Sequence, residues 1–274
     1  MRAFWGAASL MLLVGSLVGC SQFGQLQAMR SFKAANQAYA SQDWVKASAL
    51  YEEAVKEDPE LSPAYFYMAN AYDNQYRPSR KGEAANDALL EKAIAGYKMA
   101  SEKLSASASE ADKKLGKLSL EYLVASYGPD KLNDPAQAEP VVQRMIQLEP
   151  NEPSNYFALA KIYEDAGAYA EAEQMLLRAK DVRPNDSAVY MQLAGYYNRQ
   201  NMFDKTIDAL EQRAAKEPDN PEAFFTISTY YWDNAQRNFR LTDAEKRDNV
   251  EKGLTAVDKA IAIKADYMEA LVYK

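Results

Sequence analysis

The sequence has no histidine and only one cysteine among its 274 residues. Without histidine, Ser-His-Asp and Cys-His nucleophilic sites are excluded, and so is the usual proton shuttle near neutral pH. A single cysteine excludes a disulfide within the chain and, without histidine beside it, the usual zinc ligand sets. No GxxxxGK[ST] or GxGxxG stretch occurs, so no phosphate-binding loop is visible. The sequence predicts no metal site and no cofactor.

Glycine and proline are also sparse, at 11 residues each, and no block of alternating β-branched residues argues for strands. The formal charge of −7 comes without a long acidic or basic run, so we expect no nucleic-acid partner. Carboxylate pairs such as Glu52-Glu53 and Glu171-x-Glu173 fall on predicted polar helix faces, where charge serves solubility. The composition therefore favours a helical protein that is not an enzyme.

One sequence pattern occurs twice between residues 153 and 220, at an interval of 34 residues. The first copy is Tyr156, Leu159, Ala160, Tyr163, Gly167, Tyr169, Ala172, Leu176, Ala179 and Pro184. The second is Tyr190, Leu193, Ala194, Tyr197, Asn201, Phe203, Thr206, Leu210, Arg213 and Pro218. The first four residues of each copy stand at i, i+3, i+4 and i+7, so they form one apolar stripe on a helix. Each copy therefore predicts two helices with a turn between them and a proline after the second.

This spacing resembles the tetratricopeptide signature W-x2-L-G-x2-Y…A-x3-F…P, with Tyr156 in place of Trp and Ala160 in place of Gly. The resemblance implies an all-α fold, a right-handed α-solenoid of about six helix hairpins plus a truncated seventh. The expected repeats are 28–61, 62–107, 117–152, 153–186, 187–220, 221–267 and a partial 268–274. Because no closing helix follows the last of these, we expect the chain to be a piece of a longer protein.

Three stretches interrupt the period. About a dozen extra residues fall within 73–87, and the pattern resumes at Ala93. Residues 105–116 read as a polar linker or a helical extension, and 232–249 read as an insertion in the sixth repeat. The basic stretch from Arg77 to Gly82 is either a solvated loop or a contact for phosphate or lipid headgroups.

The first residues predict export. Met1-Arg2 is a short positive region, and Phe4 to Val18 is apolar but too short for an ordinary membrane-spanning helix. Residues 17–20, Leu-Val-Gly-Cys, resemble the bacterial lipobox. That resemblance implies a lipoprotein signal peptide at 1–19, lipid on Cys20 and a tether over 20–27. A plain cleaved signal and a buried free thiol are the alternatives.

Ser21 resembles the residue found in lipoproteins sorted to the outer membrane. The expected location is therefore the bacterial cell envelope, lipid-anchored at the outer membrane and facing the periplasm. Several acyl chains would make the attachment effectively permanent, where one chain is marginal.

The resemblance also implies a concave groove lined by the first helix of each hairpin. The residues expected to face it are Phe32, Phe66, Phe157, Met191 and Phe225, with Asn36, Asn70, Lys161, Asn198, Arg199 and Asp233 as partners for a bound backbone. The alternative is that the apolar groups pack between adjacent hairpins. The family's chaperone-binding carboxylate clamp is not supported, because Phe32 and Phe66 stand where it requires a cation. A bound C-terminal carboxylate would have to contact Lys161 and Arg199 instead.

These features predict a membrane-anchored tetratricopeptide scaffold or adaptor that binds an envelope protein or peptide, without catalysis. One alternative is an envelope carrier for a small molecule or glycan, with Trp232 and neighbouring tyrosines as stacking platforms. Another is that the chain is an enzyme or the helical domain of a longer, truncated protein, such as a larger enzyme. Tetratricopeptide signatures encode the hairpin and not the ligand, so the sequence does not name the partner.

Overall fold

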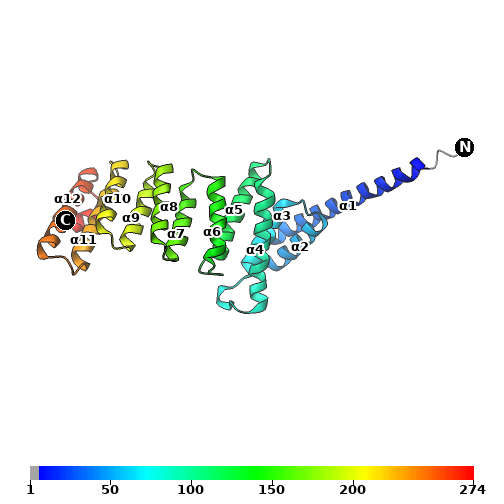
Figure 1. Cartoon of the computed structure of the whole chain (residues 1–274), viewed down its shortest axis with the longest axis horizontal. Helices are drawn as coiled ribbons and strands as arrows, with labels where there is room; N and C mark the ends of the chain where they lie inside the picture. Colours follow the sequence, from blue (N-terminus) through cyan, green and yellow to red (C-terminus); the bar gives the residue numbers. More distant parts are fainter. Residues whose placement is uncertain (1–5) are drawn as a thin grey trace. The chain divides into compact units, whose positions relative to one another are not determined.

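The computed structural model describes residues 23–274 and, for residues 6–22, only their membership of the first helix. The predicted signal peptide and the lipidation site Cys20 therefore lie outside the residues whose side chains are described. Over the described range the chain is helical, with no strand (Figure 1). The predicted all-α fold of repeated hairpins is confirmed.

The helices follow one another with short connections. Their bounds are α1 Gly6–Ala40, α2 Trp44–Glu57, α3 Ser62–Gln75, α4 Ala84–Ser105, α5 Glu110–Tyr127, α6 Pro135–Leu148, α7 Pro153–Asp165, α8 Tyr169–Val182, α9 Ser187–Arg199, α10 Phe203–Lys216, α11 Pro221–Arg237, α12 Asp243–Ile263 and α13 Met268–Tyr273, with a 3-10 turn η1 at Pro78–Arg80. Chain order thus gives six helix pairs followed by α13.

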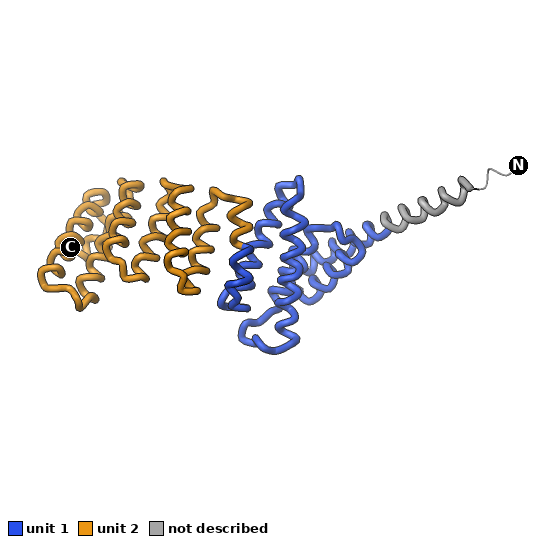
Figure 2. The backbone as a smooth tube through the Cα atoms, in the orientation of Figure 1, with its two compact units in different colours: residues 1–141 blue, residues 142–274 orange. Residues whose placement is uncertain are grey.

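The chain forms two compact units, residues 1–141 and 142–274, and the division falls inside α6 (Figure 2). In unit 1, α1 packs on α2, α3 on α4, and α4 on α5. In unit 2, α7 packs on α8, α9 on α10, and α11 on α12. Within a unit, neighbouring hairpins also pack on one another, as α2 does on α3 and α8 on α9, so a stripe that one hairpin cannot bury is covered by its neighbour.

Small residues allow the helices of a pair to approach closely. Ala69, Ala160, Ala172 and Ala194 are buried, as the register predicts. A Cβ added at Gly96 on α4 would lie 2.8 Å from the Cβ of Ala69 on α3. The tightest of these approaches therefore requires glycine on one helix and alanine on the other.

A left-handed residue lies in the turn between the two helices of successive hairpins. Asn133, Gly167 and Asn201 have φ of 56°, 76° and 58°, and they lie 34 residues apart. Asparagine and glycine are the residues that tolerate this conformation best. After Gly167 the amide of Ala168 donates to the carbonyl of Tyr163 at 2.8 Å, which closes the helix in a Schellman motif. The 34-residue period is thus a period of backbone geometry as well as of apolar side chains.

The structure shows how three of the predicted segments are built. Residues 23–27 of the predicted tether continue α1, and a Cβ on Gly24 would lie 3.1 Å from the carbonyl oxygen of Glu57 on α2. Within 73–87, the predicted loop from Arg77 to Gly82 lies in the connection between the end of α3 at Gln75 and the start of α4 at Ala84. The insertion at 232–249 extends α11 and starts α12 at Asp243, where Thr242 and Glu245 form a capping box.

Two of the glutamates assigned to polar helix faces join consecutive hairpins. On α8, Glu173 accepts hydrogen bonds from the hydroxyl of Tyr197 on α9 at 2.9 Å and from Lys205 on α10 at 2.8 Å. On α2, Glu52 likewise accepts from Lys92 on α4 at 2.9 Å, and the same ammonium donates to the hydroxyl of a tyrosine on α3 at 3.1 Å. Each unit thus carries one such glutamate–lysine–tyrosine contact across three helices.

Candidate peptide-binding site

A candidate site lies in unit 2, along one face of α11. Two adjoining pockets of about 430 and 420 Å³ share Asn198 of α9 and Tyr230, Asp233 and Arg237 of α11. The first also contains Asn201, Phe203, Asn234, Asn238, Phe239 and Arg240, and the second Thr229, Trp232, Gln236 and Tyr273. We call the two pockets together the α11 trough.

The α11 trough follows from the periodicity and the length of α11. Tyr230, Asp233, Asn234 and Arg237 stand at i, i+3, i+4 and i+7, so they share one helix face. Helix α11 has 17 residues where α9 has 13, a difference of one turn. That added turn supplies Asn234 and Arg237, and it leads directly into the loop at 238–240. The insertion in the sixth repeat therefore builds part of the site.

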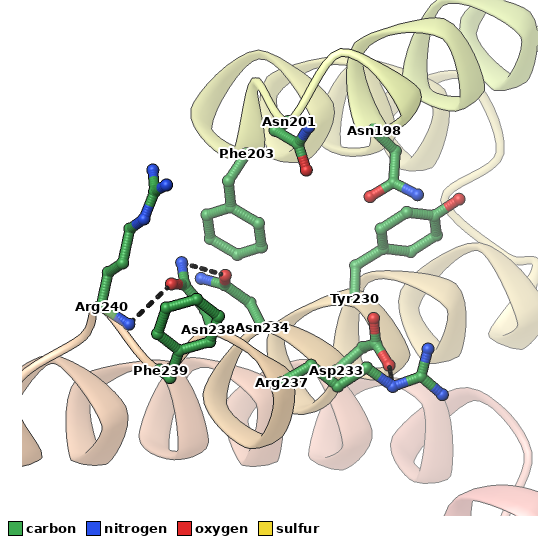
Figure 3. A pocket seen from close by; sticks show the side chains of 10 residues that line it. All are labelled: Asn198, Asn201, Phe203, Tyr230, Asp233, Asn234, Arg237, Asn238, Phe239 and Arg240. Atoms are coloured by element: carbon green, nitrogen blue, oxygen red, sulfur yellow. Dashed lines mark hydrogen bonds and ion pairs between the residues drawn. The ribbon is translucent and has the colours of Figure 1, made fainter.

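The trough is rich in side-chain amides, some of which are unused (Figure 3). Asn238 donates to Asn234 Oδ1 at 3.0 Å and accepts from the backbone amide of Arg240 at 3.1 Å. By contrast, the amides of Asn198 and Asn201 make no side-chain hydrogen bond within the described part of the chain. Figure 3 shows both projecting from the α9 end toward the space above α11. Since an amide both donates and accepts, as a peptide group does, these two can pair with a bound backbone.

Aromatic side chains border the same space. Tyr230 and Phe203 face it in Figure 3, and Phe239 beside them is 87% exposed. In the second pocket, Trp232 is 46% exposed and meets the ring of Tyr273 edge-on at 6.1 Å between centroids. Large rings gain contact area at little entropic cost, and paired with free amides they suit an extended polypeptide segment.

The apolar residues predicted to line the groove lie elsewhere. Phe66 is 4% exposed and packs on Tyr97 and Tyr122, while Phe32 packs on Tyr51. In unit 2, the side chains of Phe157 and Met191 are half-buried against the hydrophobic core, and Phe225 packs on Tyr267 and Tyr273. None of the five predicted groove residues lines the trough, and all pack against rings or core of their own unit.

The predicted cations are engaged in ion pairs. Arg199 donates through Nε and Nη2 to the carboxylate of Glu164 at 2.8 and 2.9 Å. This paired donation holds the pKa of Glu164 below its ordinary value. Lys161 pairs with Asp165 one turn further along α7. Both of the donors suggested for a C-terminal carboxylate are thus already paired with carboxylates of their own unit.

Of the predicted polar partners, the structure brings Asn198 and Asp233 together in the trough. It uses Asn36 and Asn70 internally, as acceptors from the hydroxyls of Tyr51 at 2.7 Å and Tyr39 at 2.6 Å. Trp232 and its neighbour Tyr230, the stacking platforms of the carrier alternative, also line the trough. Asn234 was not predicted, although its i, i+4 spacing from Tyr230 is visible in the sequence.

Within the described residues, no group of three or more acidic or cysteine side chains could hold a metal ion. Among the helices of the same part of the chain, none combines the length and hydrophobicity that crossing a bilayer requires.

Comparison with known proteins agrees with the repeat spacing. Residues 131–196 match the family model described as tetratricopeptide repeat. A tetratricopeptide repeat protein from Parabacteroides merdae has a similar structure, with 13% identity, a TM-score of 0.50, and coverage of 90% of this chain and 97% of that one. At that identity, the tetratricopeptide likeness establishes the fold alone.

Two further solved structures have lower TM-scores. MamA is 16% identical with a TM-score of 0.48, covering 67% of this chain and 94% of its own. PilW, titled a widely conserved type IV pilus biogenesis factor, is 15% identical with a TM-score of 0.43, covering 89% of this chain and 97% of its own. No curated protein matches the sequence.

Proposed function

We propose that this tetratricopeptide protein is a non-catalytic adaptor that binds an extended segment of a protein partner in the α11 trough. The observation that carries the proposal is the pair of unused amides, Asn198 and Asn201, beside the exposed ring of Phe239. A partner's backbone would pair with the amides while its apolar side chains pack on the rings.

The same proposal places the adaptor at a membrane. The lipobox-like residues 17–20 support a lipid on Cys20, and Ser21 supports the outer membrane facing the periplasm. Metabolic labelling with a radioactive fatty acid is expected to mark the wild-type protein and not Cys20→Ala. Equal labelling of both proteins would remove the anchor from the proposal.

The adaptor role is tested by photocrosslinking in living cells. A photoreactive phenylalanine analogue at Tyr230 or Trp232 is expected to capture a protein partner. The same analogue at Leu177, an exposed residue of α8 that does not line the trough, is the matched control. Adducts should disappear when Asn198→Ala and Asn201→Ala are combined with the reactive residue.

Two results would contradict the proposal. Capture at Leu177 as strong as at Tyr230 would mean that the trough is not the binding surface. Adducts that persist in the double amide variant would mean that the amides do not hold the partner.

A further inference from the structure

An interruption of the repeat period in unit 1, the loop after α3, meets a turn between two later helices at one pocket. The loop after α3 contributes Tyr76 and Pro78, and the turn between α5 and α6 contributes Lys131. The two segments touch, since Lys81 Nζ donates to the carbonyl of Leu132 at 3.4 Å. Insertions in helical repeats tend to gather on the face that binds ligands. The pocket they enclose has a volume of about 420 Å³ and belongs entirely to unit 1.

Three half-buried aromatic side chains, Tyr39, Trp44 and Tyr122, contribute to the lining of the pocket. The ring of Tyr39 meets Trp44 edge-on at 5.1 Å, and Tyr122 stacks on Tyr97 at 5.1 Å between centroids. These packed contacts hold the rings in place before any ligand arrives, which reduces the entropic cost of binding.

The polar groups form one hydrogen-bonded chain. The hydroxyl of Tyr39 donates to Asn70 Oδ1 at 2.6 Å, and Asn70 Nδ2 donates to the hydroxyl of Tyr97 at 3.2 Å. That hydroxyl in turn donates to Asp73 Oδ2 at 3.3 Å, and Lys131 pairs with the other carboxylate oxygen. Asp73 and Lys131 are only 8% and 19% exposed, so both charges are fixed and cancel.

These groups keep hydrogen-bonding capacity for a ligand. The ammonium of Lys131 has three donors, and the carboxylate of Asp73 has about four lone-pair sites. Asn74 Nδ2 donates to Asn70 Oδ1 at 2.9 Å, while the Oδ1 atom of Asn74 accepts no hydrogen bond within residues 23–274. The pocket thus offers donors and acceptors side by side, without net charge, between aromatic rings.

This chemistry selects among ligand classes. An anion would meet the carboxylate of Asp73, and a cation would meet the ammonium of Lys131, so each is disfavoured. A neutral sugar ring has hydroxyls that both donate and accept, and apolar C–H faces that pack on aromatic rings. We propose that this pocket of unit 1 binds a neutral saccharide, with Tyr39, Trp44 and Tyr122 contacting the ring faces and Asp73, Asn74 and Lys131 binding its hydroxyls.

Calorimetric titration of the full chain in detergent tests the proposal, with cellotriose and triacetylchitotriose as probes. Both have equatorial substituents that leave flat apolar faces. One saccharide is expected to bind per chain, with affinity reduced at least about tenfold in Trp44→Leu and in Asn74→Ala. Asn74 is exposed, so its variant is expected to fold even if Trp44→Leu does not.

Matched controls separate this pocket from the α11 trough. Gln37→Ala removes an exposed amide of unit 1 that does not line the pocket, and Asn198→Ala removes one from the trough; both should bind saccharide as the wild type does. Loss of saccharide binding in Asn74→Ala with partner crosslinking intact would support the pocket alone.

Three results would overturn the saccharide proposal. The first is that neither probe binds at a concentration of about 10 mM, which corresponds to a binding free energy near −3 kcal/mol. The second is unchanged affinity in both pocket variants. The third is binding of inorganic phosphate or an unrelated peptide that depends on Asn74 when the sugars do not bind.

Discussion

The contact that joins α8, α9 and α10 allows a quantitative prediction. Glu173 accepts from the hydroxyl of Tyr197 at 2.9 Å and from Lys205 at 2.8 Å. The two donors differ in environment: Tyr197 is 7% exposed, while the side chain of Lys205 is 51% exposed. The perturbation is a pair of double-mutant cycles built on Glu173→Ala, one with Tyr197→Phe and one with Lys205→Met.

The buried donor should dominate. Hydrogen bonds to charged groups contribute about 1.5 to 3 kcal/mol when desolvated, and a buried hydroxyl left without its partner costs about 1 to 3 kcal/mol. An ion pair with an exposed lysine contributes about 0.2 to 1 kcal/mol, because water screens it. We therefore expect a coupling energy of about 1 to 2 kcal/mol between Glu173 and Tyr197, and below about 1 kcal/mol between Glu173 and Lys205.

Hydrogen exchange of backbone amides in α8, α9 and α10, measured on the full chain, reports these energies. A coupling of 1.4 kcal/mol changes the exchange rate about tenfold. Amides of α2, α3 and α4 serve as the internal control, since repeats transmit stability mainly to their neighbours. A lysine coupling as large as the tyrosine coupling would refute the reasoning that burial decides the strength of this contact.

Two further predictions follow from the glycines and from the acidic pKa shifts. Gly96→Ala should lower the melting temperature, because the added Cβ would lie 2.8 Å from the Cβ of Ala69. Gly195→Ala should raise it, because the one atom nearby is the side-chain end of Arg199, with Nη1 at 3.3 Å, and alanine stabilises a helix by about 1 kcal/mol relative to glycine. A lower melting temperature for Gly195→Ala would contradict this account. The pKa values of Glu164, Glu173 and Glu217 are lowered, chiefly by hydrogen bonds from Arg199, Lys205 and Ser187 respectively. These carboxylates therefore stabilise the folded state fully above the ordinary pKa of about 4.5, and the stabilisation is lost as pH falls through the lowered pKa values. Protection of amides in α7 to α10 should thus decline below pH of about 4.5, and Glu173→Gln should reduce that pH dependence; a decline of the same size in the variant would contradict the assignment.

Much of the repeat architecture was predictable from residues close together in the sequence. Ala160, Ala172, Leu176 and Ala179 are buried as the helical spacing requires, and the turn residue Gly167 adopts its left-handed conformation. The capping box that begins α12 was also readable, as Thr242 followed three residues later by Glu245. The repeat spacing marks 232–249 only as an insertion in the sixth repeat, because the start of α12 is encoded by this local capping signal and not by the period.

The candidate sites were less predictable. Phe66 and Asn70 have the residue types that suit a groove, yet one packs on Tyr122 and the other binds Tyr39. Their partners lie 31 to 56 positions away along the chain. Local spacing tells which face of a helix a side chain occupies, but not whether a residue from another repeat already covers it.

The sequence by itself determined the helix, the turn and the period, since these depend on hydrogen bonds and steric limits within a few residues. Only the tertiary structure decided where unused polar groups and open aromatic faces gather, because the lengthened α11 and the paired loops of unit 1 place distant residues together. The exposure of a side chain depends on its neighbours in space, and the helical period of the sequence does not specify those neighbours.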